Sequence, residues 1–167
     1  MTPAELLKEA FGRIVEGGRG VVDGLDVDQL AHRPTPDANS IAWLVWHIAR
    51  GQDLQVADVA GTEQIWISQG FVDRFGLPLD PSAHGYGMTS EEVGAVRASA
   101  ELLLEYLHAT HAATLTYLDT VTEADLDRVV DDRWDPPVTL GVRLVSVVND
   151  DAQHVGQAGY VRGLLGL

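Results

Sequence analysis

The sequence contains no cysteine, and this absence excludes several kinds of chemistry. Without cysteine the chain forms no disulfide, no zinc site with thiolate ligands and no cysteine nucleophile. Any thiol that takes part in a reaction would therefore come from a second, small substrate. Long apolar runs are also missing, because no stretch of about 18 residues is free of charged side chains, so we expect no membrane-spanning helix.

Basic residues are few. The 167-residue chain has 11 lysine and arginine residues against 25 aspartate and glutamate residues, which gives a formal net charge of −14. This charge repels phosphate backbones and anionic lipid headgroups, so we expect neither nucleic acid nor a membrane surface as a partner. The N-terminus has no basic segment followed by an apolar run, so we expect no export signal and a cytoplasmic protein.

Four segments carry apolar residues at helical spacing, and no run alternates as a strand would. The expected helices cover residues 2–15, 41–60, 89–115 and 140–164. Capping-box sequences mark two of the starts, at Thr2 with Glu5 and at Thr89 with Glu92. Three glycines, at positions 17, 18 and 20, weaken the end of the first helix. Four amphipathic helices predict an all-α four-helix bundle, with residues 1–167 as a single domain.

The segment from Gly61 to Met88 is expected to be a long loop between the second and third helices. Glycine and proline residues occur throughout it, with aromatic residues interleaved. A connection of this length in a compact domain is usually functional or packed by its own side chains, and we expect it to cover one end of the bundle. His84 lies in this segment and is interpreted as a loop residue rather than as a fourth ligand.

An acid and a histidine lie one turn apart on the fourth expected helix. Asp150 and His154 share a helical face with core-type residues. Burying them there is costly unless they pair with each other or bind a metal ion. Asp151 lies three residues before His154 on an equally apolar stripe, so helical spacing does not choose between the two aspartates. A plain Asp–His hydrogen bond explains the pattern as well as a metal site does.

His47 is the corresponding histidine of the second expected helix. A single histidine on an apolar helix is more often a satisfied core residue than a ligand. The presence of His154 on another expected helix favours a ligand role for His47, because facing helices of bundles commonly build metal sites from inward histidines and carboxylates. Two histidines and one aspartate would leave positions open for water or substrate, as catalytic divalent metals require. Gln157, one turn after His154, can hydrogen-bond at such a site.

Two motifs in these helices resemble those of the DinB/YfiT-like superfamily. They are Trp43-Leu44-Val45-Trp46-His47-Ile48-Ala49-Arg50 and Asp150-Asp151-Ala152-Gln153-His154-Val155-Gly156-Gln157. The sequence is most similar to the actinobacterial DUF664 branch, whose members are often labelled mycothiol-dependent enzymes. The stretch Arg133-Trp134-Asp135-Pro136-Pro137-Val138-Thr139-Leu140-Gly141 also resembles that branch. The resemblance extends over essentially the whole chain.

The resemblance implies three metal ligands, which the family takes from one histidine of the second helix and two of the last. In this sequence the positions fall on His47, Asp150 and His154, so an aspartate stands where the family has a histidine. The motif thereby favours Asp150 over Asp151. The implied cofactor is a divalent metal ion, with zinc or nickel expected ahead of manganese or iron. Aspartate is a competent oxygen ligand for each of these metals.

The resemblance also implies an enzyme that activates a low-molecular-weight thiol, similar to mycothiol, for transfer to a small electrophile or for isomerisation. A metal-dependent hydrolase is one alternative, with water in place of the thiol. A non-catalytic stress-response or binding protein with a vestigial metal site is another, and the aspartate at position 150 is compatible with it. A homodimer is also compatible with the sequence, since an apolar helical face can pair two subunits.

Overall fold

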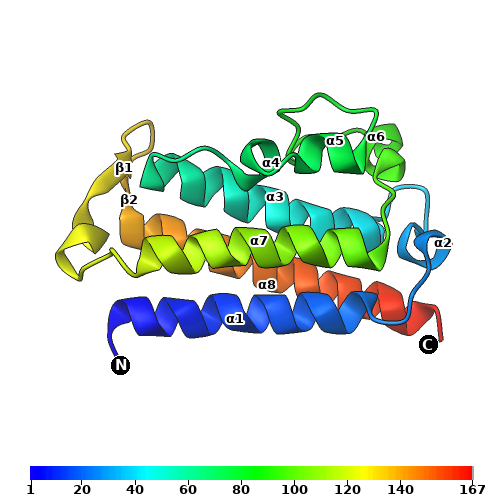
Figure 1. The fold of residues 1–167 in the computed structure, drawn as a ribbon, viewed down its shortest axis with the longest axis horizontal. Coiled ribbons are helices and arrows are strands. Elements are labelled where there is room, and N and C mark those ends of the chain that lie inside the picture. The colour runs from blue at the N-terminus through cyan, green and yellow to red at the C-terminus, as the bar shows by residue number, and fades with distance from the viewer. Residues whose placement is uncertain (167) are drawn as a thin grey trace.

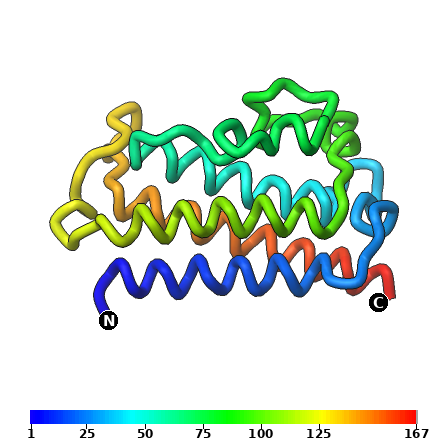
Figure 2. Tube along the Cα trace, viewed as in Figure 1, coloured from blue at the N-terminus to red at the C-terminus, as the bar shows by residue number. Residues whose placement is uncertain are grey.

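The computed structural model describes residues 1–166 and consists mainly of helices (Figure 1). The four long helices are α1 (Pro3–Val22), α3 (Ile41–Ala60), α7 (Ala100–Leu118) and α8 (Leu140–Leu164). They lie side by side along the long axis of the molecule, and α3 and α1 each pack against both α7 and α8 (Figures 1 and 2). The prediction of a mainly helical chain is confirmed.

Hydroxyl side chains start each of the four long helices. Thr2, Ser40, Ser99 and Thr139 occupy the N-cap positions, and each side-chain oxygen accepts a hydrogen bond from a backbone N–H three residues later. These bonds satisfy donors that have no partner within the helix. Thr2 and Glu5 form the complete capping box that the sequence predicts.

Helix α1 continues beyond the end that the glycines predict. A Cβ atom added at Gly17 would lie 2.5 Å from Cγ1 of Val155, and one added at Gly18 would lie 2.6 Å from Cδ2 of Leu107. Val155 belongs to α8 and Leu107 to α7, so the missing side chains allow α1 to approach both neighbours. Packing therefore outweighs the low helix propensity of glycine here.

The expected third helix is two helices, so the prediction of one continuous helix is wrong. Thr89 caps α6 (Ser90–Ala95) with Glu92, as predicted, but the backbone at Val96 is extended. Ser99 then caps α7 as a new start. A second strong N-cap within ten residues favours a break, because its side chain satisfies N–H groups that a continuous helix would have bonded internally.

The segment between α3 and α6 is not a plain loop. It contains the short helices α4 (Ile65–Ser68) and α5 (Phe71–Phe75), and it lies along the sides of α3 and α7 rather than over one end (Figure 1). Three buried aromatic rings hold it there. Trp66, Phe71 and Phe75 have ring centroids 5.3, 4.8 and 5.9 Å from that of Tyr106 on α7. Within the segment, the rings of Trp66 and Phe71 also lie 5.3 and 6.4 Å from that of Phe75.

Smaller elements complete the chain. They are α2 (Val27–Leu30), a 3₁₀-helix η1 (Ala124–Asp127) and the antiparallel strands β1 (Val129–Asp131) and β2 (Val138–Thr139). The strands were not expected, because two or three residues are too few to show an alternating pattern. Within residues 1–166, no helix combines the length and apolar character needed to cross a membrane.

Candidate metal centre

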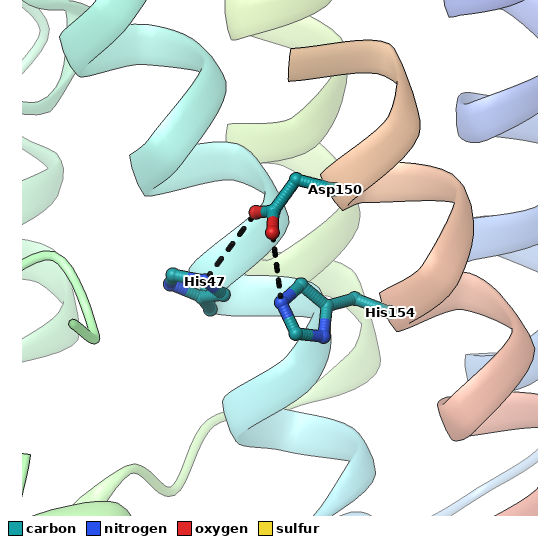
Figure 3. A group of neighbouring side chains, drawn as sticks. All are labelled: His47, Asp150 and His154. Atoms are coloured by element: carbon teal, nitrogen blue, oxygen red, sulfur yellow. Dashed lines mark ion pairs between the residues drawn. The ribbon is translucent and has the colours of Figure 1, made fainter. Parts of the chain in front are cut away.

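The three predicted ligand residues lie together between α3 and α8 (Figure 3). The carboxylate of Asp150 faces both imidazole rings: its Oδ2 is 3.7 Å from Nε2 of His47, and its Oδ1 is 3.6 Å from Nε2 of His154. One ligand atom from each residue lies within 4.8 Å of the others. Two helices far apart in sequence thus bring two nitrogen donors and one carboxylate to one place.

Asp151 does not join this group. Its side chain is 1% exposed, and no described residue hydrogen-bonds its Oδ2 atom. Burial raises the pKa of the Asp151 carboxyl group well above its ordinary value, and the nearby charge of Asp150 adds to the shift. The structure therefore separates the two aspartates that helical spacing leaves equal: Asp150 faces the histidines, and Asp151 enters the core.

The ring of His47 is held on two sides. Its Nδ1 atom lies 2.5 Å from the main-chain oxygen of His84, and its face stacks on Trp43 with a centroid distance of 4.7 Å. A carbonyl oxygen only accepts hydrogen bonds, so Nδ1 carries a hydrogen, and Nε2 is the ring nitrogen that faces Asp150. Burial is the main cause that lowers the pKa of His47, which favours the neutral imidazole that metal ions bind.

His154 is oriented in the same way. Its Nδ1 atom lies 3.0 Å from Oε1 of Gln157, so its Nε2 atom is directed at Asp150. The rings of His154 and His47 meet edge to face, with centroids 4.8 Å apart. Gln157 therefore forms the contact at the site that the sequence suggests, and both histidines present the same ring nitrogen.

The donor set fits a divalent metal ion. The Nε2 atoms of both histidines and a carboxylate converge at separations too long for direct hydrogen bonds between them, and this spacing suits a cation among the three groups. Imidazole and carboxylate are ligands of zinc, nickel, manganese and iron. In metal sites the second ring nitrogen of a histidine ligand usually donates to an oxygen, as both do here. The group could therefore bind a metal ion.

Sequence reasoning missed the main-chain contribution of the 61–88 segment. Gly85 has a φ of +109°, and a Cβ atom added to it would lie 2.2 Å from Nδ1 of His47. His84 contributes its carbonyl oxygen to the site, whereas its side chain is outside the group of three. Main-chain contacts leave no trace in a pattern of side-chain types, and a single glycine in a glycine-rich segment is not distinctive.

A cavity of about 440 Å³ adjoins the site through Gln157. Its wall is mainly apolar and is formed by Pro34, Ala38, Asn39, Leu44, Gly156, Gln157, Tyr160 and Val161. Another cavity of similar volume lies between α3 and α7, and neither wall contains His47, Asp150 or His154. Only the first cavity includes Gln157, which contacts His154, so it is the cavity next to the candidate site.

Comparison with known proteins identifies the family of the chain. The crystal structure of a conserved protein from Enterococcus faecalis is 37% identical in sequence, with a TM-score of 0.94 over 100% of this chain and 99% of that one. A search of the curated proteins gives no match. The sequence matches the DinB superfamily over residues 19–158, a range that includes His47, Asp150 and His154. The chain therefore belongs to the DinB superfamily.

Proposed function

We propose that this protein is a divalent-metal-dependent enzyme that activates a low-molecular-weight thiol, similar to mycothiol, for transfer to a small electrophile. The observation that carries the proposal is the convergence of the Nε2 atoms of His47 and His154 on the Asp150 carboxylate. The resemblance of the sequence to the DUF664 branch supports the choice of a thiol. The absence of cysteine agrees with it, since the thiol would belong to the cosubstrate.

In this proposal His47, Asp150 and His154 hold the metal, with zinc or nickel preferred. A bound divalent metal would supply Lewis acidity, which lowers the pKa of a thiol or water molecule bound to it. The protein residues act by binding and orientation. The His84 carbonyl and Gln157 fix the two imidazoles, and the cavity beside Gln157 receives the apolar part of the electrophile.

Metal binding is the first test. Elemental analysis of the purified protein and titration of the chelator-treated protein with zinc should give one ion per chain. His154→Ala should abolish binding, because it removes one of three ligands and leaves too few for a stable site. An unchanged metal content in that variant would contradict the ligand assignment. Absence of metal in the wild type, before and after titration, would favour the non-catalytic alternative.

Asp150→Ala and Asp151→Ala form a matched pair for the third ligand. The two substitutions lie at adjacent positions of α8, and each removes one carboxyl group. Only the Asp150 carboxylate faces the histidines. We expect Asp150→Ala to lose zinc affinity and Asp151→Ala to retain it, with circular dichroism as the check on folding. Loss of affinity in Asp151→Ala alone would reverse the assignment.

The reaction is tested with and without a thiol. The metal-loaded protein is incubated with a small electrophile, such as an epoxide or an activated aryl halide, and with mycothiol or a related thiol. We expect consumption of the electrophile to require the thiol and to fail in His154→Ala. Consumption at the same rate without any thiol would replace the transferase proposal with the hydrolase, in which water is the nucleophile.

A further inference from the structure

Residues 81–85 present a row of main-chain carbonyl groups to the side chains around α3. The Pro81 oxygen accepts from Nε1 of Trp66 at 2.9 Å, and the Ala83 oxygen accepts from Nε of Arg50 at 3.1 Å. The His84 oxygen accepts from Nδ1 of His47 at 2.5 Å. We call residues 81–85 the clamp segment. Its position is set by three side-chain donors, one of which is a predicted metal ligand.

Arg50, the central donor, is itself fixed. Its side chain is 1% exposed, and Nη1 donates to Oε1 of Gln64 at 3.0 Å and to the Tyr106 hydroxyl at 3.3 Å. Nη1 also lies 3.8 Å from Oδ2 of Asp53, which balances its charge. An arginine held by several planar contacts has little freedom to move. The Ala83 carbonyl is therefore tied to a rigid group.

Gly85 brings the clamp segment into direct contact with the His47 ring. With a φ of +109°, it adopts a backbone conformation that other residues rarely take. The space where its Cβ atom would lie is filled by the ring, only 2.2 Å from Nδ1. The ring thus lies against the segment at its Nδ1 edge and against Trp43 on its face, and both contacts determine where Nε2 points.

We propose that the clamp segment is part of the metal centre: the His84 carbonyl and Gly85 set the tautomer and orientation of His47, and Arg50 is a positioning residue that holds the segment in place. This inference rests on the proposed metal site. It assigns to the 61–88 segment a role in metal affinity, through the main chain and without a ligand of its own. Histidine ligands whose outer hydrogen bond is lost typically bind metal about 10- to 100-fold more weakly.

Gly85→Ala and Gly87→Ala provide the test with a matched control. Both glycines have a positive φ, +109° and +74°, so alanine strains the backbone at either position. Only at Gly85 does the added Cβ meet His47, whereas Gly87 has open space around it. We expect Gly85→Ala to weaken zinc affinity about 10- to 100-fold in a competition titration. Gly87→Ala should keep the wild-type affinity, and equal losses in the two variants would overturn the proposal.

A second readout does not depend on metal. Histidine side-chain ¹⁵N spectra of the metal-free protein report which ring nitrogen carries the hydrogen. We expect the Nδ1–H tautomer for His47 in the wild type and in Gly87→Ala, and its loss in Gly85→Ala. The opposite tautomer in the wild type would refute the clamp even if zinc binds. The expected tautomers together with no zinc binding would instead refute the proposed function and leave the clamp standing.

Arg50→Lys tests the positioning residue. Lysine keeps the positive charge beside Asp53 but has no planar set of donors for Ala83, Gln64 and Tyr106 at once. We expect weaker zinc affinity and a mixture of His47 tautomers in a folded protein. Wild-type affinity with an unchanged tautomer would remove Arg50 from this role. If Arg50→Lys does not fold, Gln64→Leu removes one of the partners of Arg50 and is measured in the same way.

Discussion

Asp150 and Asp151 are adjacent in sequence, but their carboxyl groups lie in opposite surroundings. The Asp150 side chain is 49% exposed and faces two histidines, whereas that of Asp151 is buried in the core. Successive helical residues differ by about 100° in direction, so both aspartates fall beside an apolar stripe. Helical spacing therefore does not show which of the two faces the histidines. The choice depends on which side of α8 meets α3, and a single-helix pattern does not contain that information.

Substitutions of Gln157 and Gln153 test whether a single side-chain contact to His154 affects zinc affinity. Both are exposed residues of α8, but only Gln157 accepts a hydrogen bond from Nδ1 of His154. Gln157→Leu should weaken zinc affinity about 10-fold, because it removes the acceptor that orients the ring. Gln153→Leu, which loses only a bond to the main chain of Asn149, is the control in the same calorimetric titration. Equal affinities in the two variants would contradict this role of Gln157.

At the scale of elements, the glycines of α1 have different surroundings. Gly17→Ala places a methyl group against the stiff side chain of Val155 on α8, so we expect a loss of about 1–3 kcal/mol in the free energy of unfolding. Gly12→Ala meets nothing within 4 Å and should stabilise the protein by about 0.5–1 kcal/mol, because alanine favours the helix. Urea unfolding measures both. A stabilised Gly17→Ala protein would show that α1 and α8 separate easily.

The accuracy of the helix predictions follows from how local their causes are. The N-caps at Thr2 and Thr89 depend on residues within one turn, so the sequence alone predicts them. The break before Ser99 was missed because apolar residues keep helical spacing across it. The extension of α1 through Gly17 was also missed, since it depends on contacts with α8.

At the scale of the whole molecule, Asp131 ties the β hairpin to α8. Its carboxylate accepts bonds from Arg133 and lies 3.2 Å from Nη2 of Arg143. The side-chain and main-chain hydrogen bonds from Arg133 hold the pKa of Asp131 well below its ordinary value, and the charge of Arg143 acts in the same direction. A lowered pKa contributes stability above the unfolded value of about 4, and the contribution is lost as the pH falls below it.

Asp131→Asn should therefore unfold at lower urea concentration than the wild type at neutral pH. The difference should shrink as the pH is lowered from about 4 toward 2, because the wild-type carboxylate then loses its advantage over the unfolded state. Urea midpoints of both proteins across this range provide the measurement. A difference that stays constant with pH would mean that the charge of Asp131 does not contribute.

The candidate site could be predicted from the sequence only in part, because some of its contacts depend on the whole fold. His47 and His154 were found from local motifs, whereas the contact between His47 and the main chain of His84 joins positions 37 residues apart. Such a contact depends on the path of the 61–88 segment across α3, which is set by the aromatic packing of Trp66, Phe71 and Phe75. Side-chain type predicts the candidate ligands, and the complete fold determines what orients them.

The distribution of the three candidate ligands over α3 and α8 has a thermodynamic consequence, because His47 and Asp150 are neighbours only in the folded chain. A metal ion that binds only the folded chain stabilises it by mass action, by about 2.7 kcal/mol when its free concentration is 100 times the dissociation constant. The thermal midpoint should thus rise with added zinc in the wild type and stay flat in His154→Ala. The fraction of the chain that is folded at a given temperature would then depend on the supply of metal as well as on the sequence.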